Sequence, residues 1–273
     1  MNLSTQLPQQ RMIARARELC QSDDRLDSAM MYGSFALGES DEYSDIEFLL
    51  FFRDDDFDAI IPHEWLSQIE PVAHHYTNEW GILAVIFENL VRGEFHIHRT
   101  SELDAVIKSL HGSETFPSLD ATLIADKSGA MAPLLAPTIG PPLEHGSDAE
   151  LQGLIDGFIH KMLFGFQVLQ RGELARALEM LSLTQRTLLQ MARVAEGQTT
   201  HWYIPSRNLE SELSPDAYAR FRDCTAALDA RALKRAYSKA WQWGGELMAN
   251  LRTTHDVTVP DELCWQILNK VNE

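Results

Sequence analysis

Two acidic residues, separated by one position, stand at the start of an apolar segment of the chain. Asp45 and Glu47 open the run from Ile46 to Phe52, whose apolar composition is typical of a buried strand. Because residues i and i+2 of a strand project from the same face, we expect these two carboxylates to lie side by side. Two close carboxylates resist joint ionisation unless a cation lies between them. Their hard oxygens suit Mg²⁺, which takes its remaining ligands from water and phosphates, so we predict that Asp45 and Glu47 are metal ligands.

A short motif upstream of the acidic pair has the character of a phosphate site. Gly33 and Ser34 end the apolar run at residues 28–32, and Ser34 precedes Asp45 by eleven positions. Gly33 has no Cβ and therefore lets a phosphate approach the backbone, while Ser34 offers a hydroxyl and an amide. We predict that these two residues contact the β- and γ-phosphates of a nucleoside triphosphate. The alternative interpretation is an acidic surface strand that follows a tight turn.

A third carboxylate lies on another short strand-like segment, residues 94–98. Glu94 shares one face of this segment with His96 and His98, and the two apolar residues between them point to the opposite face. We predict that Glu94 lies near the acidic pair, where it accepts the proton of an acceptor hydroxyl as a general base or completes a second metal site. The two histidines are interpreted as packed or hydrogen-bonded residues of the sheet rather than as ligands.

The elements that must position these residues indicate a mixed α/β domain over residues 1–131. Helical spacing predicts an amphipathic helix at residues 9–21 and another at 62–76. Apolar runs predict four strands, at residues 28–32, 46–52, 82–90 and 94–98. The last two strands are separated by the turn-like residues 91–93, which favours a hairpin.

The composition then changes, which indicates a second domain of another class. Residues 132–147 are rich in Pro and Gly and poor in charge, so they are interpreted as a linker. Residues 148–273 are predicted to form an α-helical domain with helices at 148–170, 173–195, 214–228, 231–251 and 260–271. Its basic residues are interpreted mainly as solvated, with contact to phosphates as the alternative: Lys161, Arg176, Arg186 and Arg193. The predicted fold class is therefore α+β, with a mixed-sheet domain followed by a helical bundle.

Composition limits the partners of this chain. The formal charge is −17, which disfavours general attraction to nucleic acid or to anionic lipid and instead favours cationic acceptors. Cys20, Cys224 and Cys264 are widely spaced and carry no zinc-binding pattern, so they are expected to be reduced thiols. The polar residues 1–17 lack a signal sequence, and no run of about 18 apolar residues is present. We therefore expect a cytoplasmic protein that does not span a membrane.

The chemical motifs resemble those of a known enzyme family. Gly33-Ser34 followed by Ser44-Asp45-Ile46-Glu47 resembles the signature of the polymerase-β-like nucleotidyltransferase superfamily. The strings MMYGSF, YSDIEF, IFENLVRGEFH and VLQRGELARALEMLS are similar to lincosamide nucleotidyltransferases of the two-domain type, and the similarity covers nearly the whole chain. The resemblance implies ATP-dependent adenylylation of a sugar hydroxyl of lincomycin or clindamycin, with Mg²⁺ as cofactor and pyrophosphate as product. It also implies a homodimer.

The resemblance assigns roles to individual residues and leaves two alternatives open. Asp45 and Glu47 are implied as metal ligands, Glu94 as the general base and Ser34 as a phosphate contact. One alternative is an aminoglycoside nucleotidyltransferase, whose polycationic acceptor would suit the charge of −17 well. The other is a non-catalytic binding module, such as the antitoxin half of a nucleotidyltransferase and helical-domain pair. The intact set of three carboxylates argues against that second alternative.

Overall fold

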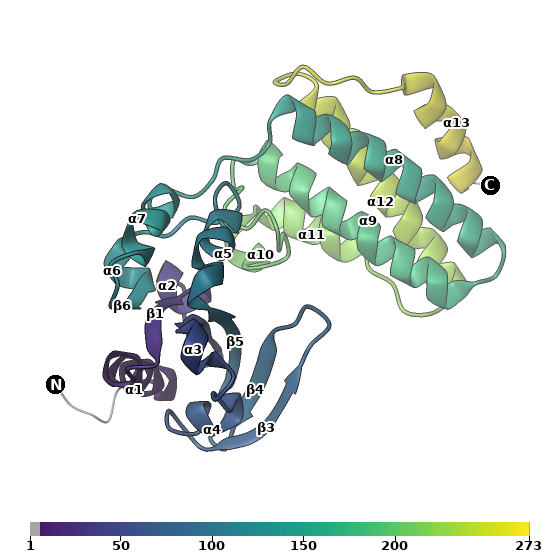
Figure 1. The fold of residues 1–273 in the computed structure, drawn as a ribbon. Coiled ribbons are helices and arrows are strands. Elements are labelled where there is room, and N and C mark those ends of the chain that lie inside the picture. The colour runs from purple at the N-terminus through teal and green to yellow at the C-terminus, as the bar shows by residue number, and fades with distance from the viewer. Residues whose placement is uncertain (1–5, 273) are drawn as a thin grey trace. The chain divides into compact units, whose positions relative to one another are not determined.

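The chain folds into two compact units, which a computed structural model describes over residues 6–272. The first unit extends to Leu143 and the second begins at Glu144. Figure 1 shows a sheet with short helices in the first unit and long helices in the second. The predicted α+β fold, a mixed sheet followed by a helical bundle, is confirmed.

The first unit is built on a six-stranded sheet with the strand order β3-β4-β5-β2-β1-β6. The strands are β1 (Leu26–Met31), β2 (Ile46–Phe52), β3 (Val72–Thr77), β4 (Leu83–Phe87), β5 (Arg92–Arg99) and β6 (Leu123–Asp126). Strands β2 and β5 are paired in parallel, whereas the other neighbouring strands are antiparallel. Because β2 and β5 run in the same direction, the N-terminal ends of the two strands lie side by side at one end of the sheet.

Short helices complete the first unit. They are α1 (Pro8–Ser22), α2 (Gly33–Leu37), α3 (Asp54–Phe57), α4 (Pro62–Leu66), α5 (Leu103–Ser109), α6 (Leu119–Thr122) and α7 (Met131–Leu135), with 3₁₀ turns at Thr100–Glu102 and Ala136–Thr138. Helix α1 buries Met12, Ala16 and Cys20, as its amphipathic spacing predicts. Helix α7 overlaps the segment 132–147 interpreted as a linker, and its Leu135 is buried in the core of the sheet unit.

The helix expected over residues 62–76 is wrong beyond its first five residues. Helix α4 ends at Leu66, and Val72–Thr77 form β3, the edge strand that pairs with β4. Pro71 lies between them and cannot continue a helix, because its ring removes a backbone donor and clashes with the preceding turn. The helical spacing of Trp65, Leu66 and Ile69 reflects one buried turn.

The four expected strands are present, and two further strands, β3 and β6, were not expected. The predicted runs at 28–32, 46–52, 82–90 and 94–98 correspond to β1, β2, β4 and β5, and β4 pairs with β5 as a hairpin. The hairpin turn precedes Arg92, because Arg92 and Gly93 already belong to β5. Strand β6 has the sequence LIAD, which is too short to show a period, and it forms by pairing with β1.

Long helices form the second unit. They are α8 (Asp148–Gln170), α9 (Leu174–Ala195) and α12 (Ala230–Leu251), accompanied by α10 (Leu209–Glu212), α11 (Pro215–Asp223) and α13 (Asp261–Asn272). All five predicted helices are found, although α11 ends at Asp223 rather than at residue 228. Gly244 on α12 packs against the ring of Phe158 on α8, where a Cβ would overlap the ring. This absence of a side chain allows the two helices to approach closely.

One predicted surface cation instead lies in the core of the helical unit. The Arg193 side chain is fully buried, and its guanidinium donates to the backbone oxygens of Pro205 and Gln198 and, at 2.7 Å, to a carboxylate oxygen of Glu212. His201 also lies 2.9 Å from the Glu212 carboxylate. Arg193 therefore holds the loop between α9 and α11 and is already occupied by partners within its own unit, which contradicts its interpretation as a solvated residue.

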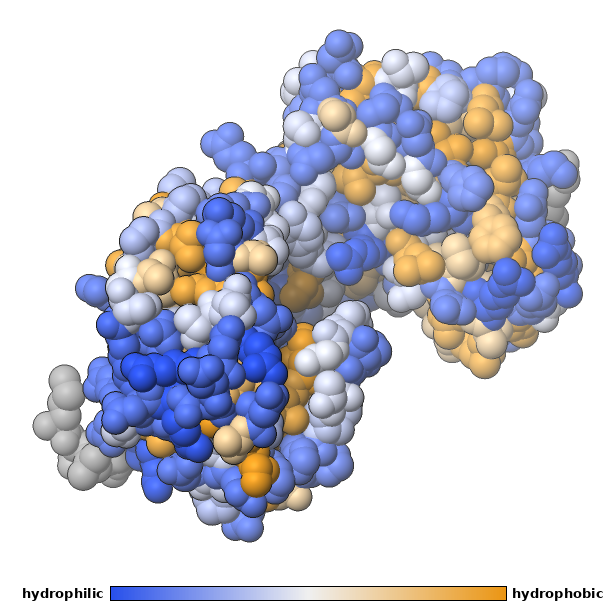
Figure 2. Space-filling model, in the orientation of Figure 1, coloured by the Kyte–Doolittle hydropathy of each residue, from blue (hydrophilic) through white to orange (hydrophobic). Residues whose placement is uncertain are grey.

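The surface carries mostly polar residues. Figure 2 shows hydrophilic residues over most of the visible face, with hydrophobic patches on both units. Within residues 6–272, no helix combines the length and the apolar character that crossing a bilayer would require.

Helix α8 begins with a capping box that makes the stability of the unit depend on pH. Ser147 is the N-cap residue, and Glu150 accepts hydrogen bonds from the Ser147 hydroxyl at 2.7 Å and from the Gly146 amide at 3.0 Å. Burial acts to raise the pKa of Glu150, but these bonds and one from His145 outweigh it and lower the pKa to about 2. The folded state therefore binds the ionised carboxylate more strongly than the unfolded chain does.

We predict that Glu150→Gln lowers the free energy of unfolding at pH 7 by about 1 kcal/mol, as loss of a helix cap does. Because the pKa of Glu150 is lowered from its ordinary 4.5 to about 2, the stabilisation is present above about pH 4.5 and is lost as the pH falls toward 2. Urea unfolding of both proteins, followed by circular dichroism from pH 7 to pH 3, should show the difference narrowing. The exposed Glu179→Gln is the control, and a difference that stays constant with pH would refute this role.

Candidate active site

The carboxylates of Glu47 and Glu94 belong to directly paired residues on neighbouring strands. In the parallel register between β2 and β5, Glu47 lies opposite Glu94 and Phe48 lies opposite Phe95. The rings of Phe48 and Phe95 stack at a centroid distance of 5.7 Å on the other face of the sheet. Since side chains alternate between the faces, Glu47 and Glu94 project from the same face. The structure therefore brings these two residues of the predicted site together.

Asp45 precedes β2 by one residue and occupies the edge of the same face. Its carboxylate forms an ion pair with Arg92, with 3.1 Å between the nitrogen and the oxygen. Arg92 is the first residue of β5, and Ile46 is paired with Gly93, so the register sets Arg92 opposite Asp45. The Asp45 side chain is 23% exposed and that of Arg92 is 63% exposed, which leaves the ion pair open to solvent. Asp45 thus lies near the other carboxylates, with the Arg92 guanidinium beside it.

Gly33 leaves space for the side chain of Glu47, because it has no Cβ. It adopts a φ of +69° at the start of α2, and a Cβ at this position would overlap the Glu47 carboxylate. A side chain at residue 33 would therefore be both strained and displaced. The next residue, Ser34, is buried, and its hydroxyl has no hydrogen-bond partner within residues 6–272. A buried hydroxyl without a partner is costly in a folded protein, which indicates that Ser34 is arranged for a ligand or for water.

Tyr32 is a site residue that the sequence interpretation did not identify. Its hydroxyl is buried and, in the part of the chain that the structure describes, lacks a hydrogen-bond partner. Burial raises the pKa of Tyr32, and the negative charges of Glu47, Glu94 and Asp45 raise it further. The phenol is therefore a neutral donor that faces the carboxylate set. Its position beside Gly33, at the end of β1, is the sequence signal that could have revealed it.

The two predicted sheet histidines follow Glu94 along its face of β5. His96 lies edge-on to the ring of Tyr32, with 5.5 Å between the centroids, and it stacks with His98 at 6.2 Å. Burial lowers the pKa of both rings, so both are expected to be neutral at pH 7. These ring contacts agree with the interpretation of both histidines as packed residues of the sheet.

The oxygen atoms on this face of the sheet suit a hard divalent cation that also binds a phosphate. Asp45, Glu47 and Glu94 supply carboxylate oxygens, and Ser34 adds a buried hydroxyl that has no partner among the described residues. No group of three His, Cys, Asp or Glu side chains within residues 6–272 is arranged to hold a metal by itself. Mg²⁺ commonly keeps several waters and binds through one or two carboxylates and substrate phosphates, which suits this arrangement.

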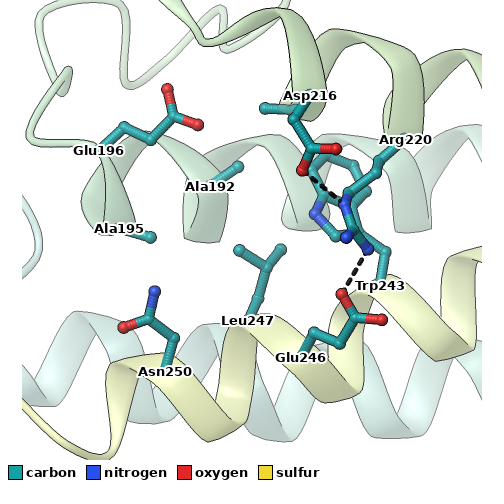
Figure 3. A pocket seen from close by; sticks show the side chains of 10 residues that line it. Ala192, Ala195, Glu196, Asp216, Arg220, Trp243, Glu246, Leu247 and Asn250 are labelled. Carbon is teal, nitrogen blue, oxygen red and sulfur yellow. Dashed lines mark hydrogen bonds and ion pairs between the residues drawn. The ribbon is translucent and has the colours of Figure 1, made fainter.

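A separate pocket lies among the helices of the second unit. Figure 3 shows Arg220 between Asp216 and Glu246, with Trp243 and Leu247 beside them. The Arg220 guanidinium donates to Asp216 at 2.7 Å and also to Glu246. Both carboxylates thus have the Arg220 guanidinium as a partner, and the pocket contains none of the residues that the sequence assigns to the site.

Comparison with known proteins links the helical half to one family. The model of the family described as lincosamide nucleotidyltransferase-like, C-terminal domain, matches residues 147–270. This match confirms the resemblance inferred from the sequence over the helical half of the chain, and it supports an enzyme of the nucleotidyltransferase class. No curated protein matches the chain.

Two solved structures are similar over most of the chain but at low identity. One is an aminoglycoside 6-adenyltransferase from Bacillus subtilis, with 11% identity, a TM-score of 0.45 and coverage of 98% of each chain. The other is a nucleotidyltransferase-like protein from Exiguobacterium sibiricum 255-15, with 11% identity, a TM-score of 0.34 and coverage of 96% of this chain and 88% of that one.

Proposed function

We propose that this nucleotidyltransferase adenylylates a sugar hydroxyl of lincosamides such as lincomycin and clindamycin, with ATP as donor, Mg²⁺ as cofactor and pyrophosphate as product. The main support is the arrangement of Glu47 beside Glu94 on one face of the sheet, with Asp45 at its edge. The match of residues 147–270 to the lincosamide nucleotidyltransferase-like family supports the choice of acceptor. The active protein is proposed to be a cytoplasmic homodimer that binds neither nucleic acid nor membrane.

In the proposed reaction, the acceptor hydroxyl oxygen forms a bond to the α-phosphorus of ATP, and the bond from that phosphorus to the pyrophosphate oxygen breaks. Glu94 accepts the proton of the hydroxyl, because a sugar hydroxyl is a poor nucleophile at neutral pH. Asp45 and Glu47 would hold Mg²⁺, which supplies neutralisation of the triphosphate charge when it is bound. The step is balanced. Pyrophosphate leaves with the electron pair of the broken bond, and Glu94 carries the proton of the acceptor hydroxyl.

The hydroxyl of Ser34 and the backbone of Gly33 are proposed to receive the β- and γ-phosphates, with the Glu47 carboxylate in the space where a Cβ of Gly33 would lie. The Ser34 hydroxyl is buried and without a partner in the described residues, so a phosphate oxygen would satisfy it without displacing another contact. Tyr32 adds a second buried hydroxyl, which the charges of the three carboxylates reach. Its neutral phenol can donate to a phosphate or to the acceptor.

The mass of clindamycin after incubation with the protein, ATP and Mg²⁺ tests this proposal. We expect a gain of one adenylyl group together with release of pyrophosphate. An aminoglycoside incubated in parallel tests the alternative acceptor class, which the charge of −17 favours. Modification of the aminoglycoside alone would overturn the lincosamide assignment. Absence of pyrophosphate release with either acceptor would instead indicate a non-catalytic binding module.

Substitution of Gly33 should impair both stability and transfer. Gly33→Ala places a Cβ against the Glu47 carboxylate at a positive φ, so we expect a loss of roughly 1–2 kcal/mol in unfolding free energy and a marked fall in transfer rate. Gly38→Ala is the matched control, because Gly38 also has a positive φ, of +75°, but a Cβ there would meet no atom within 4 Å. Equal transfer rates in the two variants would show that the contact with Glu47 does not matter.

A further inference from the structure

The ion pair between Arg92 and Asp45 involves a carboxylate that the proposed reaction also needs for metal binding. Asp45 is one of the two proposed metal ligands, and its carboxylate already contacts the Arg92 guanidinium at 3.1 Å. A cation bound to Asp45 through Oδ2 would compete with Arg92 for that oxygen. Arg92 and a metal ion at this oxygen would therefore be alternative partners of the carboxylate.

The position of Arg92 allows such an exchange at little cost. Its side chain is 63% exposed, and exposed ion pairs contribute little to stability because water and salt screen them. The backbone of Arg92 is fixed in β5 beside Ile46 and Asp45, so the guanidinium stays near the site after it leaves the carboxylate. A planar guanidinium binds phosphate oxygens through two parallel hydrogen bonds, which makes a triphosphate a suitable second partner.

We propose that Arg92 exchanges partners when nucleotide binds: it pairs with Asp45 in the nucleotide-free protein and pairs with the triphosphate once a divalent cation occupies Asp45. This inference rests on the proposed function, because it takes Asp45 as a metal ligand and a nucleoside triphosphate as the substrate. The exchange couples the two binding events. Cation binding releases Arg92 for the phosphates, and the phosphates remove the competitor of the cation. Arg92 thereby acts as a nucleotide-binding residue in a protein whose net charge of −17 otherwise repels a polyanion.

The exchange predicts opposite effects of one substitution on two ligands. In Arg92→Gln, Mn²⁺ alone should bind up to about fivefold more tightly, because the competitor of Asp45 is gone. ATP with Mg²⁺ should bind about tenfold more weakly, because the charged hydrogen bonds to the phosphates are lost. Arg92→Lys keeps the charge without the planar group and should weaken nucleotide binding by a smaller factor. Electron paramagnetic resonance measures bound Mn²⁺, and calorimetry measures the nucleotide.

Lys108→Gln is the matched control, since Lys108 forms a solvent-exposed ion pair with Asp104 on α5 and should change neither affinity. Thermal unfolding of each variant reports whether it is folded. Unchanged or tighter nucleotide binding in Arg92→Gln would overturn the exchange and leave Arg92 as a simple counter-ion of Asp45. Unchanged Mn²⁺ binding would overturn the competition. If the wild-type protein itself binds no ATP with Mg²⁺, the proposed function fails, and the Arg92 inference fails with it.

Discussion

Asp45→Asn and Glu47→Gln should each lower the rate of adenylyl transfer by at least ~10³-fold while leaving the fold intact. The proposed role of both carboxylates is to hold the cation that neutralises the triphosphate, and an amide is a much weaker ligand for Mg²⁺ than a carboxylate. Neither substitution changes the volume of the side chain greatly. The measurement is the steady-state rate of pyrophosphate release with saturating clindamycin and ATP.

The stability of these variants separates a lost ligand from a damaged fold. Removal of one charge from a like-charged pair relieves repulsion, so the thermal stability of Glu47→Gln without metal should equal or exceed that of the wild type. Asp45→Asn also releases Arg92, and a smaller gain is expected there. Asp104→Asn, which breaks the exposed ion pair on α5, is the control and should retain full activity. Near-normal turnover in both site variants would refute the metal assignment.

The fold was predictable wherever one segment carried its own signal. The long helices α8, α9 and α12 repeat their apolar residues over about 22 positions, so the 3.6-residue period is visible without any tertiary information. Strand β6 and the edge strand β3 form through pairing with β1 and β4, and their sequences alone do not show this. The helix expected over 62–76 is short because Pro71 cannot continue a helix, although Trp65 and Leu66 have helical spacing.

The residue types of the candidate site could be predicted from the sequence, but the contacts between these residues could not. The separation by two positions predicts that Asp45 and Glu47 share a face, whereas the parallel pairing that sets Glu94 opposite Glu47 is a property of the whole sheet. Arg92 was interpreted only as part of a turn, because nothing in the linear sequence indicates that it lies across from Asp45. Arg193 resembled the other helical cations, although only the loop folded over it makes its burial possible.

Loss of the Glu94 carboxylate should affect the chemical step more than substrate binding. A general base within hydrogen-bond reach of a sugar hydroxyl is expected to contribute roughly 10²–10⁴-fold to the rate. Glu94→Gln keeps the size and most of the hydrogen bonding but cannot accept the proton. We therefore expect kcat to fall within that range, while ATP with Mg²⁺ and the drug still bind. The lateral pairing of Glu94 with Glu47 makes a second role possible, as a ligand of a second metal ion.

A Mg²⁺ titration distinguishes the two roles, because they respond differently to excess cation. If Glu94 is the base, the transfer rate of Glu94→Gln stays low at every Mg²⁺ concentration, and the concentration for half-maximal activity is unchanged. If Glu94 is a metal ligand, the variant needs more Mg²⁺ and recovers when enough is supplied. Glu88→Gln, which removes an exposed carboxylate from the turn of the β4–β5 hairpin, should match the wild type throughout. Full rescue of Glu94→Gln by Mg²⁺ would therefore overturn the base assignment, since added cation cannot replace a missing proton acceptor.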